Sequence, residues 1–295
     1  MSRISRVAVV ARVESPQAVA TGLELADWLS RRGLEPALDP DSATAAGYGG
    51  TRIDPAEDYD LVVALGGDGT LLVAARALGS QAPILGVNLG RLGFLTEVPR
   101  SELYPSLVAV FNGEFALEER SCLEVRVERP GGEVEHYRVL NDAVVSKSAL
   151  SRIIEVTLSN AGGVISRFRA DGVIVSTPTG STAYNLSAGG PIIDPALPVM
   201  VITPICPHTL SLRPLVMPDS AWAEIRLESQ AEETFLSLDG REGTPLDRGD
   251  RVRISRARSG VRLVRVRRRS FYDNLREKLH WGGLEDSKSL LPPEP

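Results

Sequence analysis

Cysteine and histidine are scarce in this sequence, which limits the kinds of site that it can form. Cys122 and Cys206 are the two cysteines among 295 residues, too few for a disulfide framework or a cysteine-rich zinc site. The three histidines lie far apart in the sequence, and none belongs to an HExxH or HxxEH pair. We therefore assign no residue as a metal ligand from the sequence.

Lysine and long apolar stretches are also rare. Three of the 33 basic residues are lysines, and the phosphate-loop pattern GxxxxGKS/T does not occur. The apolar run at residues 7–11 is too short for a secretory signal, and no run approaches the roughly 20 residues that span a bilayer. The net charge of −5 does not favour nucleic acid or anionic lipid. These features predict a cytoplasmic protein with no nucleic-acid or membrane partner.

The length predicts two domains, because a domain averages on the order of 150 residues. Residues 1–117 alternate strand and helix patterns, with buried strands expected at residues 7–11, 61–65 and 83–88. This alternation predicts an α/β domain with a doubly wound parallel sheet. The segment 40–55, rich in Ala, Gly, Pro and Ser, is expected to be a loop.

Residues 118–270 have a different pattern. Short segments in which apolar and polar residues alternate, such as residues 123–128, are separated by glycine and proline turns. This pattern predicts a β-rich domain, mostly antiparallel and sandwich-like, which would bind the substrate. We expect the C-terminal segment 271–295 to be helical at its start and to pack back on the α/β domain.

The most informative stretch is Gly66-Gly67-Asp68-Gly69-Thr70, at the end of a predicted strand. Glycines allow close backbone approach, and amide N–H groups at a helix N-terminus can cradle phosphate. Thr70 suits the N-cap of the following helix. A carboxylate beside phosphates is unfavourable without compensation, so Asp68 is either a partner of Mg²⁺ or a general base. A simple turn in which Asp68 caps the helix is the structural alternative.

A second motif runs from Asp171 to Pro191, where a buried strand opens into a polar, glycine-rich loop. Tyr184 could stack on a base or ribose there, while Thr182 and Ser187 could donate hydrogen bonds. Taken alone, such a Ser/Thr/Gly run is also compatible with an ordinary loop. Ser181 lacks the GxSxG context of a hydrolase nucleophile.

These two motifs occur in order with Asn88-Leu-Gly-Arg-Leu-Gly-Phe-Leu95, with Asn141-Asp142 and with the segment 203–214. In this ordered set the chain resembles the NAD kinases over about residues 60–275. Gly-Gly-Asp-Gly-Thr alone is shared with phosphofructokinases and diacylglycerol-type lipid kinases, whereas the string after Asp171 is far more specific.

The resemblance implies transfer of a phosphoryl group from ATP, or from inorganic polyphosphate, to the 2′-hydroxyl of the adenosine ribose of NAD. It implies a divalent cation, Mg²⁺, and a homodimer or homotetramer. It implies that Asp68 is the catalytic residue. The residues that it places in the phosphate- and NAD-binding site are Gly66, Gly67, Asp68, Gly69, Thr70, Asn141, Asp142, Arg152, Arg169, Asp171, Thr182, Ala183, Tyr184, Asn185, Leu186 and Ser187.

Two points in the sequence depart from the family pattern or stay open. Asp142 stands at a position that the family fills with aspartate or the longer glutamate. Asp239-Gly240-Arg241 has arginine where the family has glutamine, so we assign this segment no role.

The arginine-rich strip 251–269 is either a solvated strand face or a docking strip. The alternative functions are a lipid kinase with the same phosphate cradle and a non-catalytic dinucleotide sensor.

Overall fold

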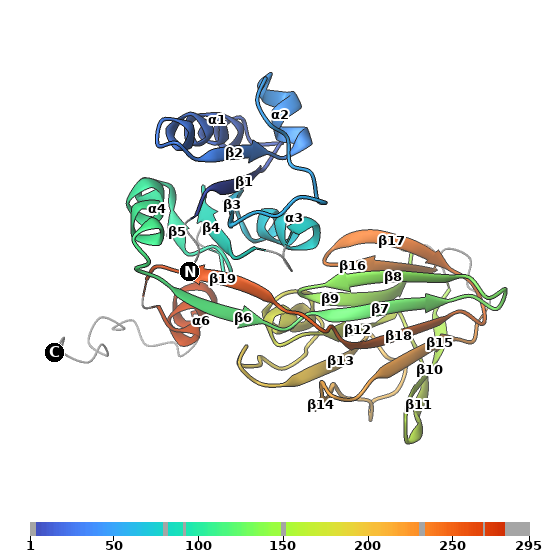
Figure 1. The fold of residues 1–295 in the computed structure, drawn as a ribbon. Helices are drawn as coiled ribbons and strands as arrows, with labels where there is room; N and C mark the ends of the chain where they lie inside the picture. The colour runs from blue at the N-terminus through green and yellow to red at the C-terminus, as the bar shows by residue number, and fades with distance from the viewer. Residues whose placement is uncertain are drawn as a thin grey trace.

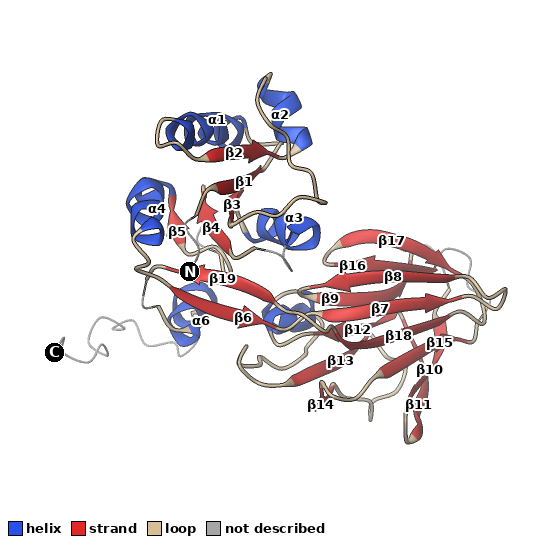
Figure 2. Cartoon of the chain, in the orientation of Figure 1, coloured by secondary structure: helices blue, strands red, loops and turns tan. Residues whose placement is uncertain are grey.

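The computed structural model describes residues 4–78, 82–90, 93–148, 152–229, 234–267 and 269–280. They form one mostly parallel sheet covered by helices and two antiparallel sheets that pack face to face (Figures 1 and 2). The predicted fold class, an α/β domain followed by an antiparallel β sandwich, is confirmed.

The first sheet has the strand order β2-β1-β3-β4-β19-β6, with β5 paired to β4. Its strands are β1 (Arg6–Ala11), β2 (Glu35–Leu38), β3 (Leu61–Gly66), β4 (Ile84–Asn88), β5 (Val98–Pro99), β6 (Ala116–Arg120) and β19 (Val261–Arg265). Every pairing is parallel except that of β6 with β19. Because β3 and β4 are parallel, the glycine-rich turn and Asn88 lie at the same edge of the sheet.

Helices cover both faces of this sheet. The helical segments of this part are α1 (Pro16–Ser30), α2 (Pro40–Ala46), α3 (Asp68–Leu78), η1 (Arg100–Glu102) and α4 (Leu103–Phe111). Val7 and Val9 of β1 belong to the same core cluster as α1 and α4, whereas Ala8 and Val10 pack with α3. Alternate residues of the strand thus bury both faces, which is why it reads as a continuous apolar run.

Two local predictions in this part are wrong. Residues 40–46 form helix α2 instead of a loop, because Asp39 caps the helix by accepting from the Ser42 N–H at 3.0 Å and Gly47 ends it with φ of 61°. Thr70 is not the N-cap of α3, which begins two residues earlier at Asp68. Helix α3 thus starts closer to the preceding strand than its apolar periodicity indicates.

The other two sheets form the sandwich. One has the order β11-β10-β15-β18-β7-β8 and the other β14-β13-β12-β9-β16-β17. Their strands are β7 (Leu123–Glu128), β8 (Val134–Val139), β9 (Asp142–Lys147), β10 (Ile154–Asn160), β11 (Gly163–Ala170), β12 (Gly172–Ser176), β13 (Val199–Ile205), β14 (Leu215–Pro218), β15 (Ala223–Leu227), β16 (Thr234–Leu238), β17 (Arg241–Leu246) and β18 (Arg251–Arg256). A single apolar core lies between them, built from the inward residues of each strand. The short helices η2 (Thr179–Thr182) and α5 (Tyr184–Ser187) follow β12.

The chain passes from the first sheet to the sandwich after β6 and returns to the first sheet in β19 (Figure 1). The predicted division at residues 117 and 118 stays a prediction, and β19, within the predicted range 118–270, pairs with β4 and β6. The final helix α6 (Phe271–Leu279) lies below the first sheet. Residues 281–295 of the predicted C-terminal segment lie outside the described residues. Within the described part, no helix is long and apolar enough to cross a membrane.

Candidate active site at the meeting of the two parts

The glycine-rich turn leaves the edge of the first sheet open at two of its three glycines. A Cβ atom on Gly66 would lie 2.2 Å from Thr70 Oγ1, so this glycine is needed for packing within the turn. A Cβ atom on Gly67 or Gly69 would meet no atom within 4 Å. The space beside Gly67 and Gly69, at the N-terminus of α3, therefore suits an anionic group that contacts backbone amides.

The carboxylate of Asp68 is held by the turn that follows β4. Its Oδ2 accepts from the Phe94 N–H at 2.7 Å. Its Oδ1 accepts from the Leu95 N–H at 3.0 Å, from the Thr96 N–H at 3.1 Å and from Thr96 Oγ1 at 3.0 Å. Among the described residues Oδ1 thus has three donors and Oδ2 one, so Oδ2 keeps a lone pair that can accept a proton.

Gly93 makes this arrangement possible, because a Cβ atom there would lie 1.8 Å from Asp68 Oδ1. We expect Gly93→Ala to displace the carboxylate. If Asp68 is the catalytic residue that the family resemblance implies, the turnover number should fall about 100-fold, since misplacement of a catalytic group by 1 Å can cost that much. Steady-state kinetics measure the loss. Gly131→Ala is the control, because a Cβ atom at Gly131 meets no atom within 4 Å. A Gly93→Ala enzyme with unchanged turnover would contradict the prediction.

A lysine from the last helix lies on the same turn. Lys278 Nζ is 4.7 Å from the centroid of the Phe94 ring, and Phe94 is the residue whose N–H binds Asp68. Burial lowers the pKa of Lys278, and the negative charge of Asp68 opposes that shift. The described residues therefore place one positive charge near the Asp68 carboxylate.

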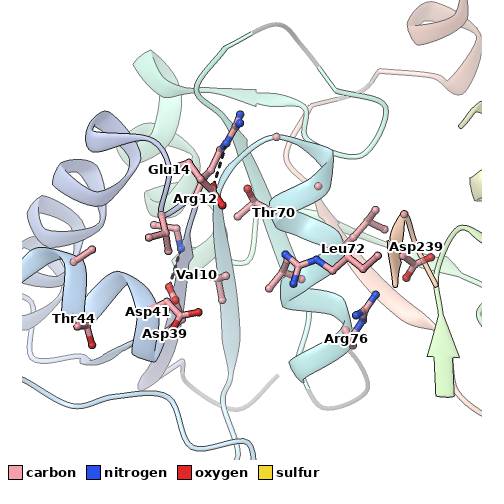
Figure 3. A pocket seen from close by; sticks show the side chains of 18 residues that line it. Val10, Arg12, Glu14, Asp39, Asp41, Thr44, Thr70, Leu72, Arg76 and Asp239 are labelled. Atoms are coloured by element: carbon pink, nitrogen blue, oxygen red, sulfur yellow. Dashed lines mark hydrogen bonds and ion pairs between the residues drawn. The ribbon is translucent and has the colours of Figure 1, made fainter. Parts of the chain in front are cut away.

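Two cavities are lined by predicted site residues, and the larger of them, of about 980 Å³, opens beside the glycine-rich turn (Figure 3). Figure 3 shows Arg76 and Leu72 of α3 on one side, Asp239 of the sandwich beyond them, and Arg12 near Thr70. Arg12 pairs with Glu14 at 3.5 Å, and Arg76 donates to the Leu238 carbonyl at 2.8 Å. The cavity is therefore built from both parts of the chain, and arginines line it together with the open glycines.

The smaller cavity, of about 300 Å³, lies in the sandwich. The predicted site residues that line it are Asn141, Asp142, Ala183 and Tyr184. Asp239 and Gly240, in the turn between β16 and β17, line both cavities. The two cavities are therefore neighbours, and this turn stands between them.

Asp239 is a structural residue of the site that the sequence analysis left without a role. It has φ of 51°, and its carboxylate accepts from the N–H groups of Leu140, Asn141 and Asp142 at 2.7 to 3.2 Å. The Asp239 N–H in turn donates to the Asp142 carbonyl at 3.0 Å. The Asp-Gly pair indicates a tight hairpin turn, but the three amides that the carboxylate binds are 97 to 99 residues away.

Two carboxylates therefore lie close together, that of Asp142 buried and that of Asp239 partly buried. Burial and the negative charge of Asp239 raise the pKa of Asp142 to about 7. Burial also raises the pKa of Asp239, against the three amide hydrogen bonds that favour its ionised form. Asp142 lines the smaller cavity and is only 3% exposed. A ligand that donates a hydrogen bond to it would favour its ionised form.

The loop that contains η2 and α5 is held in place mainly by contacts of its buried residues. A Cβ atom on Gly180 would lie 2.2 Å from the Asn141 carbonyl oxygen, so loop and strand touch through backbone. Asn185 is fully buried; it donates to the carbonyls of Ser181 and Pro191 and accepts from Thr203 Oγ1 at 2.6 Å. The structure thus uses Asn185 to hold the loop, while Tyr184 is 47% exposed beside the cavity.

The other predicted residues lie further from these cavities. Arg169 pairs with Glu155 at 3.6 Å and Asp171 with Lys147 at 3.6 Å. Neither cavity is lined by the predicted site residues Gly66, Asp68, Arg152, Arg169, Asp171, Thr182, Asn185, Leu186 and Ser187. The structure therefore brings together part of the predicted set, around the glycine turn and around Asn141, Asp142 and Tyr184.

Comparisons with known proteins point to one family. The profile of the ATP-NAD kinase N-terminal domain matches residues 7–115, and that of the ATP-NAD kinase C-terminal domain matches residues 140–266. The NAD kinase of Geotalea daltonii is 48% identical over 282 residues, which cover 95% of this chain and 99% of that protein. The NAD kinase of Geobacter sulfurreducens is 48% identical over 284 residues, with the same coverage.

Two solved structures share the fold. Yeast NADH kinase complexed with NADH superposes with a TM-score of 0.87 at 27% identity and covers 96% of this chain and 90% of its own. An NAD kinase from Archaeoglobus fulgidus in complex with ATP gives a TM-score of 0.71 at 26% identity, over 93% of this chain and 98% of its own.

Proposed function

The chain belongs to the NAD kinase family, whose reaction is the phosphorylation of NAD to NADP with ATP as donor, and on this premise we propose that Asp68 is its general base. The observation that carries the proposal is the fixed Asp68 carboxylate beside the open glycines at the N-terminus of α3. Family membership decides against the alternatives of a lipid kinase and a dinucleotide sensor.

In the proposed step, Asp68 Oδ2 accepts the proton of the 2′-hydroxyl of the adenosine ribose. The hydroxyl oxygen forms a bond to the γ-phosphorus of ATP, the bond from that phosphorus to the bridging oxygen breaks, and ADP leaves. A ribose hydroxyl is a weak nucleophile, so the rate depends on positioning and on this base. The four hydrogen bonds from residues 94–96 supply the positioning of the carboxylate.

We place the donor phosphates against the amides of Gly67 and Gly69, in the larger cavity. The α3 N-terminus carries a partial positive charge there. Arg12 lines the same cavity, as does Arg76 from the last turn of α3, and Lys278 lies over the ring of Phe94. The adenosine end of NAD is placed in the smaller cavity, against Asn141, Asp142, Ala183 and Tyr184. Because Asp68 lines neither cavity, the ribose must extend from the smaller cavity towards the turn at residues 93–96.

Roles in NAD binding for Arg152, Arg169, Asp171, Thr182, Leu186 and Ser187 stay predictions from the family resemblance. For Asn185 we propose a holding role, because its side-chain amide is already engaged by the loop.

Mg²⁺ belongs to the proposal as a cation that arrives with the donor phosphates. Mg²⁺ is commonly bound by substrate phosphates together with carboxylates and waters. Because the free lone pair of Asp68 Oδ2 is assigned to the proton, the donor phosphates would hold the ion here. No group of three His, Cys, Asp or Glu within the described part is arranged to hold a metal, and the proposal assigns the ion no set of side-chain ligands. The ion would neutralise charge on the transferred group.

Gly69→Ala tests the position of the donor phosphates. The added methyl group meets no protein atom, and alanine is favoured over glycine inside a helix by about 0.5–1 kcal/mol, so the fold should be as stable or more stable. The methyl group would obstruct the phosphates, and we expect the KM for ATP to rise about tenfold or more. A variant with an unchanged KM for ATP would rule out contact at Gly69.

A second experiment tests the donor and the metal. NADP formation is followed with an NADP-specific dehydrogenase, using NAD with ATP and Mg²⁺. We expect excess EDTA to lower the rate about 100-fold or more, because the charge on the phosphates would no longer be neutralised. Replacing ATP with inorganic polyphosphate decides whether the second donor is also accepted. Full activity in EDTA would remove Mg²⁺ from the proposal.

The proposal includes a cytoplasmic location and a homodimer or homotetramer. Cys122 is buried and Cys206 exposed, and both are free thiols, which suits a reducing compartment. Light scattering of the purified protein measures the number of subunits.

A further inference from the structure

Four charged side chains form an ion-pair network next to the turn that holds Asp68. Arg265 Nη1 lies 3.2 Å from Glu97 Oε2, and Arg265 Nε lies 2.5 Å from Glu118 Oε2. Arg120 Nη2 lies 2.6 Å from Glu118 Oε1. The side chains of Glu97 and Arg120 are 5% exposed and that of Arg265 is 12% exposed. The network, which consists of Glu97, Glu118, Arg120 and Arg265, carries two charges of each sign.

The antiparallel pairing of β6 with β19 creates the network. Glu118 and Arg120 are two residues apart on β6 and therefore point to the same face of the sheet. Arg265 is opposite Ala116 in the register, which makes it a diagonal neighbour of Glu118. β19 thus returns from the sandwich to place one arginine beside the turn after β4.

Arg265 is in direct contact with the turn that holds Asp68. Its Nη1 donates to the Leu95 carbonyl at 3.3 Å, while the Leu95 N–H donates to Asp68 Oδ1 at 3.0 Å. Leu95 is therefore held by Arg265 on its carbonyl side and by Asp68 on its amide side. At the other end, Arg120 Nη1 donates to Thr179 Oγ1 at 3.4 Å, at the start of the loop that carries Tyr184.

Stability alone does not account for four charges at this place. Burial raises the pKa of Glu97 and lowers that of Arg120, so the ionised form of each is disfavoured by its surroundings. Apolar residues of similar volume are often as stabilising as a buried ion pair, or more so. What charged partners add is a fixed geometry at the Leu95 carbonyl, which an apolar cluster could not supply.

We propose that Arg265 is a positioning residue that holds the turn at residues 94–96, and through it the Asp68 carboxylate, in the orientation needed for phosphoryl transfer. This inference rests on the proposed role of Asp68 as the base. Arg265 itself does not touch the reacting atoms in this account.

A double-mutant cycle on the full-length enzyme tests the proposal. Arg265→Lys keeps the positive charge, but a single ammonium group cannot donate to Leu95, Glu97 and Glu118 with the geometry of the guanidinium group. We expect kcat to fall about tenfold or more, with the KM values for NAD and ATP changed by less than about threefold. In the Asp68→Asn background the same change should alter kcat by less than about twofold, because two residues that act through one group are not additive.

Arg129→Lys is the matched control. The side chain of Arg129 is 17% exposed, close to the 12% of Arg265, and it also pairs with two carboxylates, Glu135 at 2.7 Å and Asp250, but within the sandwich. We expect it to lower the melting temperature and leave kcat unchanged. An equal loss of kcat in Arg129→Lys, or a loss in Arg265→Lys that persists in full in the Asp68→Asn background, would overturn the proposal.

Two further measurements keep the outcomes apart. If Arg265→Lys does not fold, Glu118→Gln weakens the hold on the same arginine at a side chain that is 38% exposed, and an unchanged kcat there overturns the inference. Near wild-type turnover of Asp68→Asn would instead overturn the proposed function itself. Retained turnover in Arg265→Lys together with lost turnover in Asp68→Asn would overturn only the positioning role.

Discussion

Asp68→Asn is expected to lower kcat by about 10²–10⁴, while NAD and ATP still bind. General-base assistance contributes this much to proton transfer, which corresponds to about 3–5 kcal/mol at roughly 1.4 kcal/mol per factor of ten. The asparagine oxygen can still accept from Leu95 and Thr96, but its NH₂ group would face the Phe94 N–H, a donor against a donor. We therefore also expect a loss of stability of about 1–3 kcal/mol.

Two measurements separate lost chemistry from lost structure. Calorimetric titration with NAD should give a dissociation constant close to that of the wild type. The pH profile of kcat in the variant should lose the limb on which activity rises with the ionisation of the base. Turnover within a factor of three of the wild type would show that another group, or the donor itself, takes the proton.

Features carried by contiguous residues could be predicted from the sequence. β3 followed by Gly66–Thr70 is one such unit, because the apolar run, the glycines and the acid all lie within ten residues. The doubly wound sheet and the sandwich were also predictable, since each strand shows its burial in its own pattern. Asn141 and Asp142 came from the family resemblance, whereas Tyr184 was already a candidate from its polar, glycine-rich loop. The structure places all three around one cavity.

Features that depend on distant partners could not be predicted in the same way. Residues 93–95 enter the sequence analysis only within a motif of the family resemblance, whereas the amide groups of residues 94–96 bind an aspartate 26 to 28 residues earlier. Asp239 binds amides about 100 residues away, and Arg265 reaches Leu95 across 170 residues. Periodicity and motif spacing report on local structure only, so a side chain that bonds distant backbone leaves no signal in them.

A different limit applies to Asn185. It lies inside the family motif, and the resemblance placed it in the binding site together with its neighbours. The structure shows a side chain without exposed surface whose donors and acceptor are engaged within the loop and with β13. A residue can thus belong to a motif because it shapes the loop, and only the contacts distinguish this from ligand binding.

Asp142→Asn is expected to stabilise the protein at high pH and not at low pH. The pKa of Asp142 is raised by burial and by Asp239 from an ordinary value of 3.8 to about 7, so the folded state binds this proton more tightly than the unfolded state. Above about pH 7 the folded protein must keep a buried carboxylate ionised. That cost falls as the pH drops towards 4 and vanishes below it, because both states are then protonated.

Asparagine has nearly the same shape and carries no charge at any pH. Between about pH 4 and pH 7, the cost of the buried charge rises by about 1.4 kcal/mol for each pH unit. We therefore expect the variant to gain on the order of 2–4 kcal/mol of unfolding free energy at pH 8 and almost nothing at pH 4. Denaturant unfolding at pH 4, 6 and 8 measures the difference. Asp58→Asn, at an exposed position, is the control. A gain that does not depend on pH would contradict the prediction.

The same substitution should weaken NAD binding if Asp142 accepts a hydrogen bond from the adenosine part. Binding to an ionised acceptor contributes about 1.5–3 kcal/mol, so we expect the KM for NAD to rise about tenfold or more at pH 8. The variant would then be more stable but would bind NAD more weakly. Both effects come from the same buried charge, which destabilises the free protein and is compensated when NAD donates a hydrogen bond to it. A more stable variant with an unchanged KM for NAD would confirm the cost of the buried charge and rule out the contact of Asp142 with NAD.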